Sequence, residues 1–196
     1  MRRTTPLPVA ALAGAFAGAL ALCGACGSPP AGDLPTNIQP QTAVGQGPAG
    51  VGSELAELRR VTARFHDFEA ARDAGWSAQI TGCMSNPGVG AMGFHYGNPA
   101  YIDGAVAVDQ PELLLYEPEK NGRMRLVGIE YIVPLAAWTS PQPPRLFGRD
   151  FAVNAAFGIW ALHAWVWNEN PSGIFADWNP KVTCAFASST STMSHD

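Results

Sequence analysis

The spacing of apolar positions after residue 52 predicts a helix. Between residues 53 and 74 large apolar residues recur every three or four positions, and charged residues occupy positions between them. Ser53 is expected to cap the N-terminus of this helix, and Gly75 is expected to end it as a left-handed cap. The apolar side of this helix is expected to pack against a flat surface. Five residues form this side: Leu55, Leu58, Val61, Phe65 and Phe68.

Later apolar runs predict strands, two of which flank Asn121-Gly122, a pair typical of a tight hairpin turn. A proline-rich loop is expected over residues 135–150, which contain three prolines, and a helix over residues 153–162 is an alternative that would shift the start of the last strand. The predicted strands lie within residues 92–96, 111–118, 123–133 and 159–167.

Side chains should alternate between the two faces of the strand over residues 123–133. One face is expected to carry Val127, Ile129, Tyr131 and Val133, and the other Gly128, Glu130 and Ile132. The predicted fold class is α+β: a mainly antiparallel sheet of four to five strands, with the N-terminal amphipathic helix packed on one face.

Both ends of the chain differ in composition from its middle. Arg2 and Arg3 precede an apolar run of about 16 residues, which is typical of a secretory signal and short for a membrane span of about 20. Residues 27–52 carry one charge and are predicted to be a flexible tether. The domain organisation is therefore a signal over residues 1–26, this tether, one globular domain over residues 53–184 and a disordered tail over residues 185–196.

The signal ends Leu-Cys-Gly-Ala-Cys, which resembles the lipobox of bacterial lipoproteins. In that family a small residue precedes a cysteine that is lipidated and becomes the new N-terminus, which implies lipidation of Cys26. The chain departs from the family at Cys23, where a leucine is preferred. The resemblance implies an exported protein held in the cell envelope through its lipid anchor only. The alternative is ordinary cleavage nearby, which would release a soluble secreted or periplasmic protein.

Charged residues are sparse and mostly acidic. The chain has 12 Lys and Arg against 16 Asp and Glu, and removing residues 1–26 takes away two of the basic ones. Nucleic acid is not an expected partner, because the basic stripe that neutralises phosphates is missing. The sequence has neither a phosphate-cradling glycine loop nor a dinucleotide fingerprint, so no nucleotide cofactor is expected.

Two cysteines, Cys83 and Cys184, remain after the signal. In an oxidising compartment such a pair most simply forms a disulfide. Closing this loop of about 100 residues would stabilise the fold by roughly 4 to 5 kcal/mol. The alternative, a catalytic or metal-binding thiol, has no Cys-x-x-Cys spacing to support it.

His95, Glu130 and His163 stand in apolar strand segments. An unpaired buried polar group costs about 1 to 3 kcal/mol, so each of them is expected to be bonded or to face a cavity. If their strands are neighbours, two imidazoles and one carboxylate meet on one face and form a set that binds zinc or non-haem iron. The alternatives are a metal-free polar pocket for a small ligand and structural pairing of Glu130 with a histidine.

Aromatic residues on the same segments are expected to line a pocket beside this site: Tyr96, Tyr131, Trp165 and Trp167. His66 is either a fourth ligand or part of a solvated helix flank, and Glu117 is expected to be a turn residue. The leading hypothesis is an exported, lipid-anchored domain with a divalent-metal site next to an aromatic pocket, its activity undetermined. The alternatives are a metal-free module that binds a small molecule or an envelope component, and a structural envelope lipoprotein.

A set of motifs over residues 54–184 resembles an uncharacterised family of exported bacterial proteins. The resemblance implies a single exported domain and no particular activity. The motifs are Gly-Phe-His-Tyr-x-Asn-Pro, Leu-Leu-Tyr-Glu-Pro, Val-Gly-Ile-Glu-Tyr, Leu-His-Ala-Trp-Val-Trp and Asn-Pro-Ser-Gly-Ile-Phe-Ala-Asp-Trp-Asn-Pro.

Overall fold

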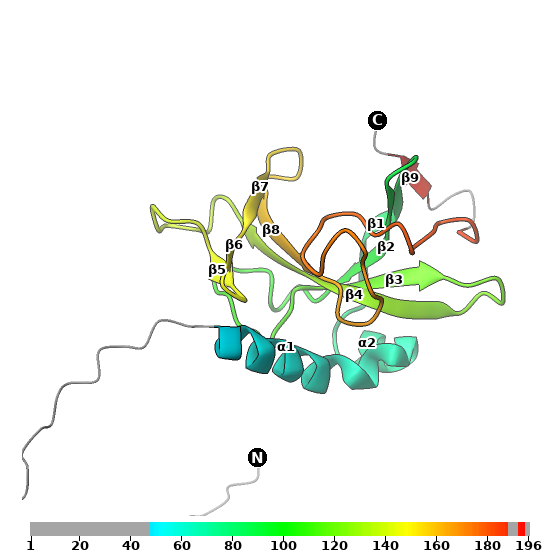
Figure 1. The fold of residues 1–196 in the computed structure, drawn as a ribbon, viewed down its shortest axis with the longest axis horizontal. Coiled ribbons are helices and arrows are strands. Elements are labelled where there is room, and N and C mark those ends of the chain that lie inside the picture. The colour runs from blue at the N-terminus through cyan, green and yellow to red at the C-terminus, as the bar shows by residue number, and fades with distance from the viewer. Residues whose placement is uncertain (1–47, 188–191, 195–196) are drawn as a thin grey trace, which may run out of the picture. The chain divides into compact units, whose positions relative to one another are not determined.

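The structure, a computed structural model, describes residues 48–187 and 192–194 (Figure 1). The predicted signal, the lipidation site Cys26 and the tether up to residue 47 lie outside the described residues. Within the described residues, no helix is long and apolar enough to cross a membrane.

The N-terminal helical region has three parts, where one continuous helix was predicted: α1 (Pro48–Thr62), a 3-10 turn η1 (Ala63–His66) and α2 (Phe68–Asp73). The prediction was wrong at the start, because α1 begins five residues before Ser53. Ser53 lies inside α1 and donates its hydroxyl to the Gly50 carbonyl. The break falls at Asp67, whose extended backbone and carboxylate cap α2 by accepting the backbone N–H of Glu69.

The end of α2 is as predicted. The Gly75 N–H donates to the Arg72 carbonyl, and the Trp76 N–H donates to the Ala71 carbonyl, which is the hydrogen-bond pattern of a Schellman motif. Gly75 has a φ of 112°, and a Cβ there would come within 2.8 Å of the Asn98 side chain. A glycine is therefore required where the chain leaves the helices for the sheet.

The described part of the chain contains a seven-stranded sheet with the order β7-β8-β4-β3-β2-β1-β9. Six strands form an antiparallel sheet, and β9 adds to β1 in parallel. The strands are β1 (Ala78–Asn86), β2 (Gly90–Gly97), β3 (Leu113–Pro118), β4 (Met124–Pro134), β7 (Ala152–Asn154), β8 (Ile159–Ala164) and β9 (Thr192–Ser194).

The α+β class and the antiparallel sheet are confirmed, but the expected strand number was too low. The segment that forms β1, Ala-Gln-Ile-Thr-Gly-Cys-Met-Ser-Asn, has no sustained apolar run. The alternative helix over residues 153–162 is wrong, because β7 and β8 form a hairpin there. The expected loop over residues 135–150 contains a small separate hairpin of β5 (Arg145–Leu146) and β6 (Arg149–Asp150).

The predicted hairpin of β3 and β4 contains a β-bulge. Leu115 pairs with Gly128 and Tyr116 pairs with Leu126, so Val127 is an extra residue on β4. Val127 consequently packs with Leu115, on the face opposite Ile129, Tyr131 and Val133. The expectation that Val127 shares a face with Ile129 was wrong, because the bulge interrupts strict alternation.

Two cores pack on the two faces of the sheet. The larger core lies between the helices and one face, and its fully buried members include Leu58, Tyr116 and Ile129. The smaller core lies on the opposite face, which residues 168–184, here named the cover segment, overlie (Figure 1). Its buried residues are Ala91, Leu115, Val127, Trp165 and Val182.

The predicted disulfide is present and ties the end of the cover segment to the sheet. Cys83 on β1 is bonded to Cys184, with Cα atoms 5.7 Å apart. Cys83 is fully buried, and the cover segment also bonds the sheet through a bridge between Ala91 and Asn179. The smaller core is thus closed by a covalent link as well as by packing.

Candidate metal centre

Three strands of the sheet bring His95, Glu130 and His163 together. Glu130 on β4 is the direct cross-strand partner of His163 on β8. His95 lies on β2, one strand further away, and reaches the same carboxylate diagonally across β3, because Leu115 pairs with His95 and Leu113 pairs with Glu130. The antiparallel register alone therefore places the two imidazoles on either side of one carboxylate.

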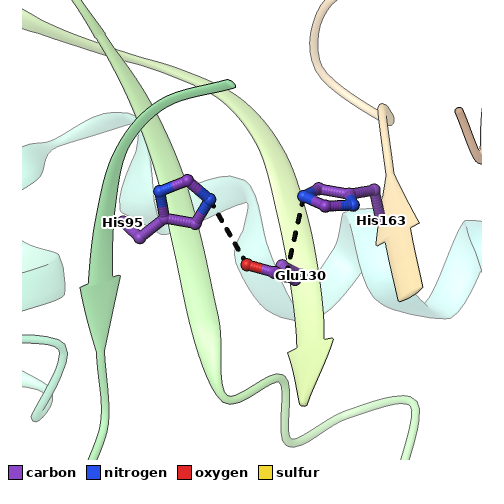
Figure 2. A group of neighbouring side chains, drawn as sticks. All are labelled: His95, Glu130 and His163. Carbon is purple, nitrogen blue, oxygen red and sulfur yellow. Dashed lines mark ion pairs between the residues drawn. The ribbon is translucent and has the colours of Figure 1, made fainter. Parts of the chain in front are cut away.

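Figure 2 shows both imidazoles directed toward the Glu130 carboxylate. His95 Nε2 lies 3.3 Å from Glu130 Oε2, and His163 Nε2 lies 3.6 Å from Glu130 Oε1. One ligand atom of each residue lies within 4.8 Å of the other two. The exposed fractions of the three residues are 3, 6 and 4%, so the group is enclosed by protein.

His95 is oriented by Thr81 on β1. The Thr81 hydroxyl lies 2.7 Å from His95 Nδ1 and donates to the Gly82 carbonyl at 2.9 Å. Because the single hydroxyl proton is used in that second bond, the Thr81 oxygen accepts the Nδ1 proton of His95. The Nε2 atom of neutral His95 then presents a lone pair to Glu130.

His163 is oriented from the cover segment. Its Nδ1 lies 3.5 Å from Asp177 Oδ1, so a carboxylate faces the side of the ring that points away from Glu130. The Trp165 ring is nearly parallel to the imidazole, with a ring-centroid distance of 6.1 Å. Gly128 makes room for this tryptophan, since a Cβ there would come within 2.9 Å of it.

The burial of the three residues changes their acid–base properties. Burial and the neighbouring His163 lower the pKa of His95 to about 3, so His95 is neutral at physiological pH. Burial raises the pKa of Glu130, and His163 opposes this effect. Burial alone would lower the pKa of His163, but Glu130 and Asp177 together raise it. The two histidines therefore respond in opposite directions, because only His163 lies between two carboxylates.

The predicted aromatic pocket residues are not gathered at this site. Trp165 lies beside His163, as expected. Tyr96 and Tyr131 pack with the larger core on the helix face, because each directly follows a site residue along a strand and so points the opposite way. Trp167 lies beyond the end of β8, where its indole N–H donates to the Thr62 hydroxyl. The pocket prediction is therefore corrected to one residue, Trp165.

The two secondary candidates also lie elsewhere. His66 is exposed at the end of η1 and packs against Trp167, which agrees with a helix flank. Glu117 is buried, pairs with Arg125 and accepts the Thr183 N–H, so it links the hairpin to the cover segment. Glu117 is consequently a structural anchor and more than the turn residue that was expected.

Two surface hollows lie away from the candidate centre. One, of about 490 Å³, lies between the β1–β2 turn and the end of the cover segment, and Ser85, Val89 and Pro180 are among its lining residues. The other, of about 720 Å³, lies between α2 and the β3–β4 turn, with His66 and Arg123 in its lining. None of the three candidate ligands lines either hollow.

Thr81 and Asp177 were not identified from the sequence. Thr81 lies in the unpredicted strand β1, where no pattern marks it. Asp177 lies in the Phe-Ala-Asp-Trp-Asn-Pro motif, and nothing in that motif indicates a role for its carboxylate. Its position next to His163 depends on the path of the cover segment, which local sequence patterns do not specify.

Comparisons of the chain with protein-family models, with curated proteins and with solved structures gave no match.

Proposed function

We propose that this protein binds a divalent metal ion through His95 Nε2, the Glu130 carboxylate and His163 Nε2. The separation of these atoms is the observation that carries the proposal. Direct hydrogen bonds between a charged nitrogen and a carboxylate are about 2.7–2.9 Å long. The distances of 3.3 and 3.6 Å exceed that range and are close to the roughly 3.3–3.4 Å between ligands of a tetrahedral ion with bonds of about 2.0–2.1 Å.

The unsatisfied nitrogens of His163 support the same conclusion. Both are buried, and neither makes a hydrogen bond. A buried polar atom without a partner costs about 1 to 3 kcal/mol, which a metal bond at Nε2 would offset for that atom. Structural pairing with Glu130 at the observed 3.6 Å would leave His163 Nε2 without a hydrogen bond.

Two imidazoles and one carboxylate suit zinc or iron and leave coordination positions for water or a small molecule. His95 has a hydrogen-bond partner at Nδ1, and the Asp177 carboxylate faces Nδ1 of His163 at 3.5 Å, so in both rings Nε2 is the atom directed toward Glu130. Trp165 and the apolar residues of the smaller core would exclude bulk water from part of the centre.

Elemental analysis of the purified full-length protein tests the proposal. We expect about one zinc or iron ion per chain in the wild type, and at least a tenfold loss in His95→Ala, His163→Ala and Glu130→Gln. His66→Ala is the matched control, because it removes an exposed histidine from the same domain. Equal, substoichiometric metal in all five proteins would refute the proposal.

We also propose that the protein is exported and held in the cell envelope by a lipid on Cys26. The signal-like N-terminus supports this proposal, and the Cys83–Cys184 disulfide is compatible with an oxidising compartment. Cys26→Ser and Cys23→Ser form a matched pair three residues apart. We expect the lipid mass and the membrane-bound fraction to be lost in Cys26→Ser alone; loss in neither variant would refute the anchor.

A further inference from the structure

The two histidines of the candidate centre are held by different chemistry. His95 is bonded to the hydroxyl of Thr81, a neutral group that is 6% exposed and belongs to the sheet. His163 faces the carboxylate of Asp177, whose side chain is 70% exposed and belongs to the cover segment. One ligand thus has a buried neutral hydrogen-bond partner, and the other faces a charged group at the surface, 3.5 Å away.

We propose that Asp177 is a positioning residue that orients His163 for the metal and supplies the second negative charge that a buried dication requires. This inference rests on the proposed metal-binding function. A dication bound by two neutral imidazoles and the Glu130 carboxylate keeps one positive charge, and a buried uncompensated charge is unfavourable. The Asp177 carboxylate, on the far side of His163, makes the group neutral in total.

The backbone on both sides of Asp177 is anchored, although its side chain is exposed. The carbonyl of Ala176 accepts the indole N–H of Trp165, and the carbonyl of Trp178 accepts the side-chain amide of Asn170. Asn179 bridges to Ala91 through two backbone hydrogen bonds of 3.1 Å. The backbone that carries the carboxylate is therefore already anchored next to His163 by its own segment.

Trp165 couples this anchor to the ligand. Its ring lies parallel to the His163 imidazole, and its N–H bonds the residue directly before Asp177. The position of the imidazole and the position of the carboxylate are consequently set by the same side chain.

Zinc binding to the full-length protein tests this role. Asp177→Asn keeps a hydrogen-bond acceptor and removes the charge, whereas Asp177→Ala removes both. We expect zinc affinity, measured by chelator competition, to fall about tenfold in the first and up to about 100-fold in the second. Asp73→Asn is the control, since it removes an exposed carboxylate at the end of α2. Its affinity should match that of the wild type.

A second measurement separates positioning from a general effect on the fold. Because Asp177 is exposed, the thermal unfolding of the metal-free Asp177→Asn protein should match that of the metal-free wild type. Wild-type zinc affinity in both Asp177 variants would overturn this inference alone. A loss of affinity matched by unfolding of the metal-free variants would also overturn it. Failure of the wild type to bind zinc or iron would overturn the proposed function as well.

Discussion

The two faces of the sheet differ in how their buried polar side chains are hydrogen-bonded. On the helix face, the hydroxyls of Tyr116 and Tyr131 donate to the carbonyls of Phe65 and Val108 at 2.7 Å, and the Trp76 indole donates to a backbone carbonyl at 3.1 Å. On the cover-segment face, both nitrogens of buried His163 lack a hydrogen bond. The phenol and indole groups of the helix face are thus satisfied by backbone carbonyls, although Glu54 Oε2 on α1 is also buried without a partner, whereas on the other face both nitrogens of one candidate ligand lack a partner.

The two faces are also closed by different means. The helix face is covered by α1, η1 and α2 and contains most of the buried aromatic residues. The cover-segment face has a small core and is closed by an irregular segment with a disulfide at its end. Hydrophobic burial therefore stabilises the first face, while a covalent link and polar anchors hold the second.

The largest expected effect on stability is that of removing the disulfide. In metal-free protein, Cys83→Ser combined with Cys184→Ser should lower the free energy of unfolding by about 4 to 5 kcal/mol, because the bond closes a loop of 101 residues. Denaturant unfolding measures the loss. Reductant should destabilise the wild type equally and leave the double variant unchanged. A loss below about 1 kcal/mol would show that packing alone closes this face.

The helix face should respond to loss of apolar volume. Leu58 on α1 is fully buried, so Leu58→Ala should lower the free energy of unfolding by about 3 kcal/mol. Metal content per folded chain should stay unchanged, because the ligands lie on the other face. Leu55→Ala, at a partly buried position of the same helix, should cost less. Loss of metal in folded Leu58→Ala protein would contradict the independence of the two faces.

The ligand set could be predicted from the sequence because charge is sparse in this chain. Glu130 and the two histidines stand out in apolar strand segments, and antiparallel neighbours bring such positions together. The same period of two places Tyr131 opposite Glu130, so the sequence already contained the reason why the predicted aromatic pocket was wrong. The bulge at Val127 depends on pairing with β3, and no local pattern indicates it.

Long-range features were the least predictable. The sequence of β1 mixes polar and apolar residues and contains glycine, so its strand form depends on pairing with β2. Thr81 could not be identified before that strand was known. Asp177 reaches His163 only because the cover segment returns over the sheet and is pinned at Asn179 and Cys184. The candidate ligands can therefore be identified from local sequence patterns, whereas Thr81 and Asp177, which lie next to them, cannot.

Glu112 tests how a buried carboxyl behaves outside the candidate ligand set. It accepts the Ile132 N–H, and burial raises its pKa from 4.5 to about 8. Between these values the folded state holds a proton that the unfolded state has lost, so stability falls as pH rises. From pH 5 to 7 the wild type should lose about 2 kcal/mol relative to Glu112→Gln, at about 1.4 kcal/mol per pH unit less the curvature at the ends.

Denaturant unfolding of both metal-free proteins at several pH values measures this difference. The comparison between the two proteins cancels the titration of groups that they share. Parallel pH profiles would mean that Glu112 ionises in the folded protein as it does in the unfolded chain.

The smallest effect compares the two faces directly by one isosteric change on each. Tyr116→Phe leaves the Phe65 carbonyl without its buried donor and should destabilise the protein by about 1 kcal/mol with no change in metal content. Glu130→Gln should abolish metal binding. In metal-free protein at pH 7 it should preserve stability or increase it by up to about 1 kcal/mol, because burial disfavours the charge it removes.

The sign of the Glu130→Gln effect on the stability of the metal-free protein distinguishes a structural role of Glu130 from a ligand role. If Glu130 were there to pair with the histidines, its removal would destabilise the metal-free protein at least as much as Tyr116→Phe does. If it is a ligand, the metal-free fold tolerates the change and only metal binding is lost. Parallel unfolding curves and elemental analyses of the two variants measure both quantities. If the helix face supports the fold and the opposite face binds the metal, Tyr116→Phe should lower stability and keep the metal. Glu130→Gln should lose the metal without loss of stability.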